Sequence, residues 1–218
     1  MVSILKSTCC AFFAFAIFFS GCASNSGNQG VSGFISPPQN PENVVVKVSL
    51  RNRAAYVLEG DRPLMITPVA IGKPGAETPQ GRFRVIDKIV EKRSGTYGFH
   101  VRGGEIRPGT RGQTPSGWHY VGYPLPYWVE FSPGYGFHAG AVWPTPRTHG
   151  CLRVHPRVAP QFFQIVREGT PVLIAPGQPE DATLGRNIAR PTDYADPDPP
   201  GSWMVSRRAF YALMGPGR

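Results

Sequence analysis

The sequence lacks a long apolar run, and its one strongly hydrophobic segment lies at the amino terminus. Residues 11–19 are continuously apolar, but Thr8 and Ser20 bound this run, which is shorter than the roughly 18 residues that a transmembrane helix requires. A single charge, Lys6, precedes the run and small residues follow it, so residues 1–21 are typical of an export signal. The alternative, a retained membrane helix, is disfavoured by the length.

The end of this segment has a second feature. The sequence "FSGC", residues 19–22, resembles the lipobox of bacterial lipoproteins, in which the cysteine after the cleavage point is acylated. We therefore expect lipidation of Cys22 and a stable lipid anchor in a membrane. Phe19 stands where that box usually has Leu, so cleavage by an ordinary signal peptidase is the alternative. Both routes predict an exported protein in the cell envelope, on the periplasmic side.

Cysteine is scarce, and the predicted processing makes it scarcer. Of the four cysteines, Cys9 and Cys10 leave with the signal and Cys22 carries the lipid, so only Cys151 remains as a thiol. A lone thiol in an exported protein has no partner for a disulfide. Cys151 is therefore either buried and inert or retained for its chemistry.

Acidic residues are also few. The 14 Asp and Glu face 23 Lys and Arg, which gives a formal net charge of +9, and the loss of Lys6 removes one positive charge. A basic surface suits an anionic neighbour such as cell-wall polymer or lipid head groups, although it also serves solubility alone. The sequence has no zinc finger or other nucleic-acid-binding motif, so no nucleic-acid partner is expected.

The composition favours one turn-rich, mainly β domain with appendages. The chain has 218 residues, about one well-buried domain, and contains 26 Gly and 24 Pro. Residues 22–43 are rich in Ser, Gly, Asn and Pro and predict a flexible tether. The domain is expected over residues 44–176. A Pro- and Arg-rich extension follows at 177–218, in which residues 203–214 predict a short helix that packs on the domain or stays loose.

Apolar stretches place the expected strands and one helix. The strands are predicted at residues 44–50, 54–60, 64–72, 82–90, 127–131, 135–138 and 171–175, and the first two form a hairpin. Val158, Phe162, Ile165 and Val166 share one face of a helix. Residues 91–124 show no periodicity, so we expect a long irregular segment, which is usually functional or disordered.

The richest chemistry lies in "FHAG", residues 137–140, and "THGCLRV", residues 148–154. A cysteine nucleophile needs a base within hydrogen-bond reach and donors for a developing oxyanion. His138 ends a predicted strand upstream of Cys151, so one returning loop can bring the imidazole to the sulfur. His149, Gly150 and Cys151 offer consecutive backbone N–H groups.

Two alternatives compete with a nucleophile. An inert buried Cys151 fits poorly beside the histidines and arginines that lie between His138 and His155. A metal site could use His138, His149, Cys151 and His155, but the compact Cys-x-x-Cys or His-Glu-x-x-His spacings are missing. We interpret His155 as a polar residue at a strand end or helix entry.

Together with "ETPQGRF" upstream and "EGTPVLI" downstream, these motifs resemble the L,D-transpeptidase catalytic domain, or YkuD domain, over residues 44–175. The resemblance implies a mainly β fold of β-sandwich-like mixed sheets with one short helix after the catalytic cysteine. Cys151 is then the nucleophile and His138 the general base and acid. His149 and Gly150, with the Cys151 amide, shape the oxyanion hole.

The resemblance also implies roles for two further residues, Arg153 and Ala139. Arg153 is expected to organise the pocket or to meet a substrate carboxylate, with a salt bridge that braces the loop as the alternative. Family members usually have Gly or Ser where this chain has Ala139. If that position acts through its backbone carbonyl, Ala139 can still orient the imidazole of His138.

The implied reaction is ping-pong acyl transfer on peptidoglycan stem peptides. The Cys151 thiolate attacks the carbonyl before the terminal D-Ala of a tetrapeptide stem, D-Ala leaves, and an amine resolves the thioester. The resemblance implies no metal or other cofactor. Two alternatives remain: the same Cys-His site used with water, as an L,D-carboxypeptidase or hydrolase, and a non-catalytic wall-binding lipoprotein.

Overall fold

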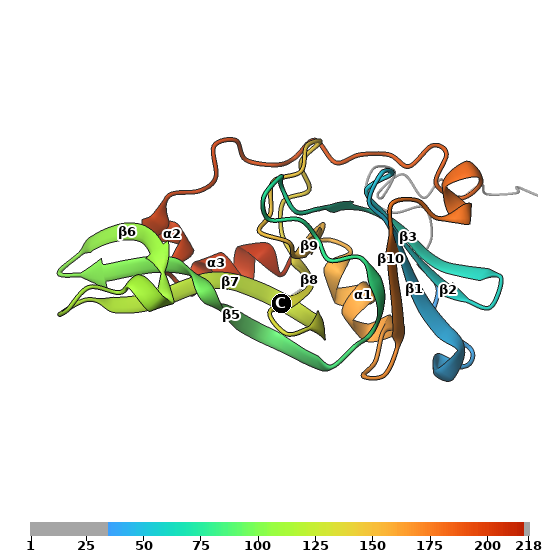
Figure 1. Cartoon of the computed structure of the whole chain (residues 1–218), viewed down its shortest axis with the longest axis horizontal. Coiled ribbons are helices and arrows are strands. Elements are labelled where there is room, and N and C mark those ends of the chain that lie inside the picture. The colour runs from blue at the N-terminus through green and yellow to red at the C-terminus, as the bar shows by residue number, and fades with distance from the viewer. Residues whose placement is uncertain (1–34, 216–218) are drawn as a thin grey trace, which may run out of the picture.

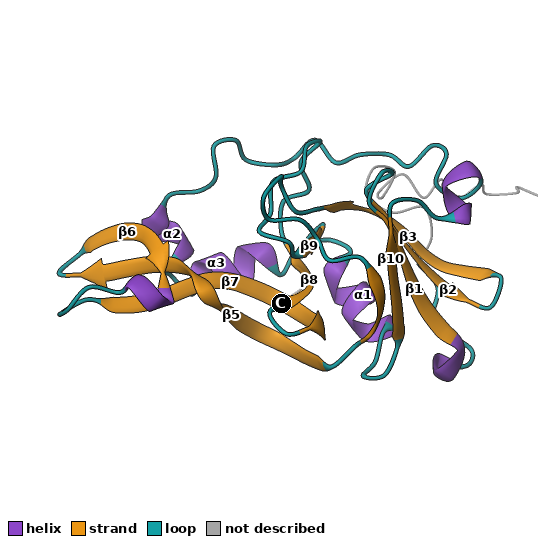
Figure 2. Cartoon of the chain, in the orientation of Figure 1, coloured by secondary structure: helices purple, strands orange, loops and turns teal. Residues whose placement is uncertain are grey.

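A mixed sheet of ten strands dominates the protein (Figure 2). The computed structural model describes residues 35–215; the predicted signal peptide, residues 1–21, and the predicted lipid attachment site, Cys22, lie outside the described residues. The sheet order is β4-β10-β1-β2-β3-β9-β8-β7-β5-β6. Neighbours are antiparallel except β1 with β10 and β8 with β9, which are parallel. The prediction of a mainly β fold with mixed strand directions is confirmed.

The strands are β1 Val44–Ser49, β2 Ala54–Glu59, β3 Arg62–Ala70, β4 Gly81–Arg84, β5 Asp87–Arg102, β6 Glu105–Thr110, β7 His119–Ser132, β8 Tyr135–Ala139, β9 Leu152–Val154 and β10 Pro171–Ala175. The helices are α1 Ala159–Ile165, α2 Gly201–Met204 and α3 Arg208–Leu213, with short 3-10 turns η1 Pro41–Asn43, η2 Arg111–Gln113 and η3 Pro179–Ala182. Among these described helices, none is long and apolar enough to cross a membrane.

The main core lies between the sheet and α1. Helix α1 confirms the predicted helix after Cys151, and its Phe162 is buried against Phe137 of β8, with ring centroids 4.8 Å apart. Strand β9 adds Leu152 and Val154, which are also buried. Because successive side chains of a strand point to opposite faces, this packing commits the residues between them to the other face of the sheet.

The predicted hairpin at residues 44–60 is confirmed as β1 and β2, whose register pairs Val46 with Val57. The predicted strand at residues 82–90 is interrupted at Val85 and Ile86. Its first part, β4, pairs with β10, and its second part, β5, pairs with β7. One apolar stretch therefore serves two regions of the sheet.

The prediction of an irregular segment at residues 91–124 is wrong. That segment forms most of β5, all of β6 and the start of β7, which project from the body of the protein (Figure 1). We call these three strands the arm. Its strands carry little alternation because they bury little, and cationic side chains stack on its rings: Arg102 and Arg107 lie over Trp118, at 4.8 and 5.1 Å from the ring centroid.

The carboxy-terminal extension packs on the domain. After β10 the chain forms η3, runs across the molecule, and ends in α2 beside β6 and α3 beside β7 (Figure 1). The single short helix predicted at residues 203–214 is thus two helices, and Phe210 of α3 is buried. At the other end of the described chain, Ile35 bridges to Met65 and the amide of Gln39 donates to Glu59 at 3.2 Å.

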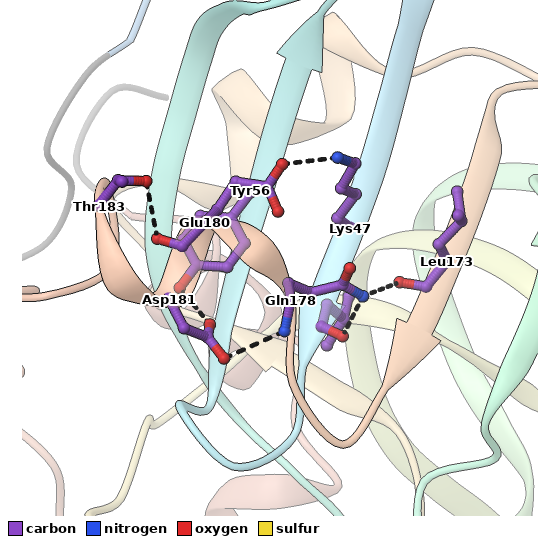
Figure 3. Close-up of polar contacts among 8 residues, drawn as sticks. Lys47, Tyr56, Leu173, Gln178, Glu180, Asp181 and Thr183 are labelled. Atoms are coloured by element: carbon purple, nitrogen blue, oxygen red, sulfur yellow. Dashed lines mark hydrogen bonds and ion pairs between the residues drawn. The ribbon is translucent and has the colours of Figure 1, made fainter.

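A polar cluster attaches the start of the extension to β1 and β2 (Figure 3). Tyr56, which is fully buried, donates its hydroxyl to Asp181 Oδ1 at 2.7 Å, and Ser49 donates to Asp181 Oδ2 at 2.8 Å. Lys47 forms an ion pair with Glu180 at 2.6 Å. These bonds satisfy polar groups that the packing of the extension removes from water.

Candidate active site

Strands β8 and β9 bring the two predicted catalytic side chains to one face of the sheet. The parallel register pairs Phe137 with Leu152 and His138 with Arg153. Phe137 and Leu152 are buried in the main core, so His138 and Arg153 point to the opposite face. Cys151 precedes Arg153 by two residues and therefore shares that face. The returning loop expected from the sequence is the segment between β8 and β9.

Strand β7 completes this face next to β8. The register pairs Glu130 with Gly136, and the Trp128 ring lies 6.4 Å from the His138 ring, measured between centroids. A side chain at Gly136 would not fit, because a Cβ there would lie 2.7 Å from the carbonyl oxygen of Val129 and 2.9 Å from the Trp128 ring. The missing side chain of Gly136 thus lets the β7 backbone and the Trp128 ring pack closely against β8.

Cys151 is a half-buried free thiol. Its Sγ donates to the carbonyl oxygen of Gly134 at 3.8 Å. Burial raises the pKa of the thiol, and the nearby amide of Gly136 and the charge of Arg153 oppose that rise. The resting side chain is therefore a neutral thiol, which needs a base to become a nucleophile.

His138 is buried and has its orientation fixed by its own neighbour. The ring Nδ1 lies 2.9 Å from the carbonyl oxygen of Ala139. A carbonyl can only accept, so Nδ1 carries the proton and Nε2 has a free lone pair. This confirms that Ala139 can orient the imidazole through its backbone. Burial, together with the charge of Arg153, lowers the pKa of His138 to about 3 despite the opposing carbonyl.

The turn before Cys151 is held by a hydroxyl that the sequence analysis did not single out. Thr148 donates its Oγ1 hydrogen to the carbonyl oxygen of Cys151 at 2.7 Å and accepts from the amide of Gly150 at 3.1 Å. The Gly150 amide, one of the three predicted oxyanion donors, thus already has an acceptor. Gly150 has φ +105°, and a Cβ there would lie 2.5 Å from the Tyr135 ring.

His149 lies at the rim of the site. It is exposed and stacks on Tyr97 of the arm, with ring centroids 4.2 Å apart and planes inclined by 17°. Partial burial of the ring lowers the pKa of His149, and the charges of Lys73 and Arg153 act in the same direction. Tyr97 was missed from the sequence because its segment showed no pattern.

Arg153 of β9 packs against the segment that connects β8 and β9. Its guanidinium carbon lies 4.4 Å from the centroid of the buried Trp143 ring, and a Cβ on Gly140 would approach its Cδ to 2.9 Å. Within residues 35–215 no carboxylate forms an ion pair with it, so the loop-bracing salt bridge has no partner in the part of the chain described. Burial lowers the pKa of Arg153, with Asp198 opposing, but a guanidinium stays charged.

These side chains line one cavity of about 860 Å³. The sheet contributes Cys151, His138 and Arg153, the arm contributes Tyr97, and the carboxy-terminal extension contributes Asp198 and Trp203. The contribution of the extension was not predicted, because its Pro- and Asp-rich sequence has no periodicity from which a position could be inferred. A cavity of this volume can hold a drug-sized ligand or a short peptide segment.

His155 lies at the edge of this cavity with a structural role. It is buried, its Nε2 lies 3.0 Å from Asp193 Oδ1, and its Nδ1 accepts from the amide of Arg157 at 3.2 Å. Across residues 35–215, no three His, Cys, Asp or Glu side chains gather closely enough to hold a metal ion. The predicted polar position at the end of a strand agrees with this placement, directly after β9.

Comparisons with known proteins were consistent with one another. The L,D-transpeptidase catalytic domain family, YkuD, matches residues 43–174. A Bacillus licheniformis protein named as an L,D-transpeptidase, YkuD, is 29% identical over 156 residues, which are 68% of this chain and 77% of the relative. An L,D-transpeptidase structure from Stackebrandtia nassauensis matches with 20% identity and a TM-score of 0.47, over 66% of this chain and 60% of that one.

The L,D-transpeptidase LdtMt1, solved in complex with imipenem, matches with 21% identity and a TM-score of 0.46, over 61% of this chain and 59% of that one. The chain thus spans less than two thirds of these two solved proteins.

Proposed function

Because the chain belongs to the L,D-transpeptidase catalytic domain family, we propose that it transfers the acyl group of a peptidoglycan tetrapeptide stem through a thioester on Cys151. One observation carries the assignment of roles. Cys151, a free thiol, shares a sheet face with a histidine whose Nδ1 is bonded to the Ala139 carbonyl and whose Nε2 is free to act as a base.

The pKa shifts favour general-base catalysis over a resting thiolate–imidazolium pair. Burial keeps the thiol of Cys151 protonated and the ring of His138 neutral. In the free protein the sulfur and the ring each bond to a backbone carbonyl, and catalytic hydrogen bonds are often formed only with substrate in place. As the sulfur attacks the stem carbonyl, His138 Nε2 takes its proton.

The proposed reaction forms a thioester on Cys151 and then transfers its acyl group to an amine. A C–S bond forms, and the carbonyl oxygen becomes an oxyanion, for which we propose the amides of Cys151 and His149 as donors. The C–N bond to D-Ala breaks, and His138 returns the proton to the leaving amine. A second amine attacks the thioester, gives a proton to His138, and expels the sulfur, which recovers its proton.

Arg153 supports this chemistry through its charge. It lies on the same face two residues from Cys151, where a positive charge stabilises the developing thiolate. Because it forms no ion pair within residues 35–215, its planar donors are available for a substrate carboxylate.

The proposal is tested by release of D-Ala from purified tetrapeptide muropeptides, followed by mass spectrometry. We expect Cys151→Ala to lower release by about 10³-fold or more, because the nucleophile is lost. Imipenem should add its mass to the wild type and not to the variant. Unchanged release by a folded Cys151→Ala protein would exclude the proposed role.

The same assay separates the alternatives through the masses of the products. Dimers indicate transfer to a second stem, whereas shortened monomers without dimers indicate an L,D-carboxypeptidase. A folded wild type that releases no D-Ala and takes no imipenem adduct would favour a wall-binding protein without catalysis.

Export and anchoring are proposed from the sequence alone. Residues 1–21 are removed as a signal and Cys22 carries the lipid, which tethers the domain at the cell envelope. Mass spectrometry of the mature amino terminus should show an acylated Cys22, and Cys22→Ser should release the protein from membranes. An unmodified mature terminus would indicate ordinary signal cleavage.

A further inference from the structure

Part of the extension lies across the catalytic cavity. We call residues 193–206 the strap. At its start, Asp193 bonds to His155 at 3.0 Å, the carbonyl oxygen of Ala195 accepts from the Trp143 indole at 3.2 Å, and Asp196 pairs with Arg147 at 2.9 Å.

At the end of the strap, Arg93 of the arm donates to the carbonyl oxygens of Met204, Val205 and Ser206, at 3.1 to 3.2 Å. Being fixed at both ends, the strap is a wall of the site.

The strap carries a carboxylate into a cavity that already holds a cation. Asp198 and Arg153 both line the cavity, yet within residues 35–215 they form no ion pair with each other. They are nevertheless close enough to interact. Asp198 opposes the burial that lowers the pKa of Arg153, and the pKa of Tyr123, raised mainly by burial, responds to Asp198 and to Arg153 in opposite directions. A negative and a positive group thus face one cavity across a gap.

A gap between one guanidinium and one carboxylate is complementary to a head group with a carboxylate and an ammonium on the same carbon. The guanidinium binds the carboxylate through paired N–H donors, and the carboxylate accepts from the ammonium. We propose that Arg153 and Asp198 bind the zwitterionic end of the stem's diamino acid, so that this protein selects stems whose third residue ends in an amino-acid group. The inference rests on the proposed function and adds the substrate class.

The position of the pair fits the length of such a side chain. Cys151 and Arg153 are two residues apart on one extended segment, which separates their α-carbons by about 6.6 Å. In such a stem three methylenes join the α-carbon next to the attacked carbonyl to the distal amino-acid centre, so an extended side chain places that centre at a similar distance from the carbonyl carbon. A stem acylated on Cys151 can therefore place its distal head group between Arg153 and Asp198.

The test compares two synthetic tetrapeptides that differ only in the distal amine of the third residue, meso-diaminopimelate or 2-aminopimelate. We expect the wild type to release D-Ala from the diaminopimelyl peptide with a kcat/KM about tenfold higher or more, since the second peptide leaves Asp198 without a partner. In Asp198→Asn the ratio of the two values should fall to about one.

Asp196→Asn is the matched control. It makes the same chemical change two residues away on the strap, at a side chain that pairs with Arg147. This variant should keep the wild-type ratio even if both rates fall. An unchanged ratio in Asp198→Asn, or an equal loss for both peptides, would overturn the inference and leave Asp198 with a structural role.

Calorimetric binding of the same two peptides to Cys151→Ala provides the comparison without turnover. If the wild type releases D-Ala but the ratio of the two kcat/KM values is the same in Asp198→Asn, only the inference about Asp198 fails. If neither peptide is turned over, the proposed function fails, and equal binding of both peptides would then also refute the recognition of the amine.

Discussion

At the scale of single residues, the environment of Cys151 and His138 determines how protons move. Burial acts in opposite directions on the two groups: it raises the pKa of the thiol and lowers the pKa of the imidazole to about 3. Each shift favours the neutral form. In the proposed mechanism the proton therefore transfers during the attack on the substrate, assisted by the charge of Arg153 and by the backbone amides at the turn.

This arrangement predicts an unusual pH profile for acylation by imipenem. The base form of an ordinary histidine is lost near pH 6.5, whereas His138 keeps its free Nε2 far below that value because its pKa is lowered. We expect the second-order acylation rate to stay level between about pH 8 and pH 5. Mass spectrometry of the adduct over time measures it, with circular dichroism as a check on folding. An acylation rate that falls to half its value near about pH 6.5 and continues to fall at lower pH would contradict the prediction.

Gly150 offers a second prediction at this scale. It combines a φ of +105° with a site where a Cβ would lie 2.5 Å from Tyr135. Gly75 has a similar φ of +81° but open space around its missing Cβ. Gly75→Ala should therefore cost only the backbone strain, about 1–2 kcal/mol, and keep activity. Gly150→Ala should lower both thermal stability and D-Ala release much further; equal effects in the two variants would show that the contact with Tyr135 is unimportant.

At the scale of elements, the strap depends on a few side-chain anchors. Asp193 holds it through His155 and through an ion pair with Arg157 at 3.4 Å. We expect Asp193→Ala to speed proteolytic cleavage within residues 193–200 several-fold, because the segment has no strand or helix of its own there. Asp61→Ala, at an exposed turn between β2 and β3, is the control. Equal cleavage in both variants would mean that the strap is held elsewhere.

Elements with alternating or helical periodicity were predictable from the sequence. The hairpin of β1 and β2 and helix α1 each bury one face in the main core. Burial of one face requires apolar residues at a regular spacing, and this spacing can be recognised in the sequence. The arm does not. Its strands pair through the backbone and leave much of their surface exposed, with Arg102 over the ring of Trp118 next to β7, so nothing in the sequence distinguishes them from a loop.

The candidate site divides in the same way. The placement of His138 and Cys151 at one site was predictable because both lie in short motifs, His138 on β8 and Cys151 directly before β9. The expectation that Ala139 could orient His138 needed only its backbone carbonyl. Tyr97 and Asp198 reach the cavity only through the arm and the strap. Their positions depend on contacts between segments far apart in the chain, which no local pattern encodes.

At the scale of the whole molecule, the extension links the β1–β2 region of the sheet to the region of β7 and β6. It is attached to β1 and β2 through the cluster around Asp181, lines the candidate site as the strap, and ends in α3 beside β7. Figure 1 shows its path across the molecule. Arg190, between these regions, donates to the backbone carbonyl oxygen of Arg53 at 2.8 Å. Because the extension forms a wall of the cavity and is bonded to the domain at several places, the stability of the fold is coupled to the shape of the site.

Asp181 makes this coupling measurable. Burial opposes its ionisation, but hydrogen bonds from Tyr56, Gln178, Ser49 and Asn52 outweigh burial and lower its pKa. A lowered pKa means that the folded state binds its proton less tightly than the unfolded chain does. The ionised carboxylate therefore stabilises the fold above the unfolded pKa near about 3.9, and this stabilisation is lost as the pH falls through the lower folded value.

We therefore expect Asp181→Asn to reduce the free energy of unfolding by about 1.5–3 kcal/mol at pH 7, because bonds to a charged acceptor are weakened. Urea unfolding of wild type and variant measures this difference, which should shrink progressively below about pH 4 as the wild-type carboxylate gains its proton. Asp61→Asn, an exposed change of the same charge, should show little difference at either pH. A deficit that stays constant down to acidic pH would show that shape rather than charge at residue 181 holds the extension in place.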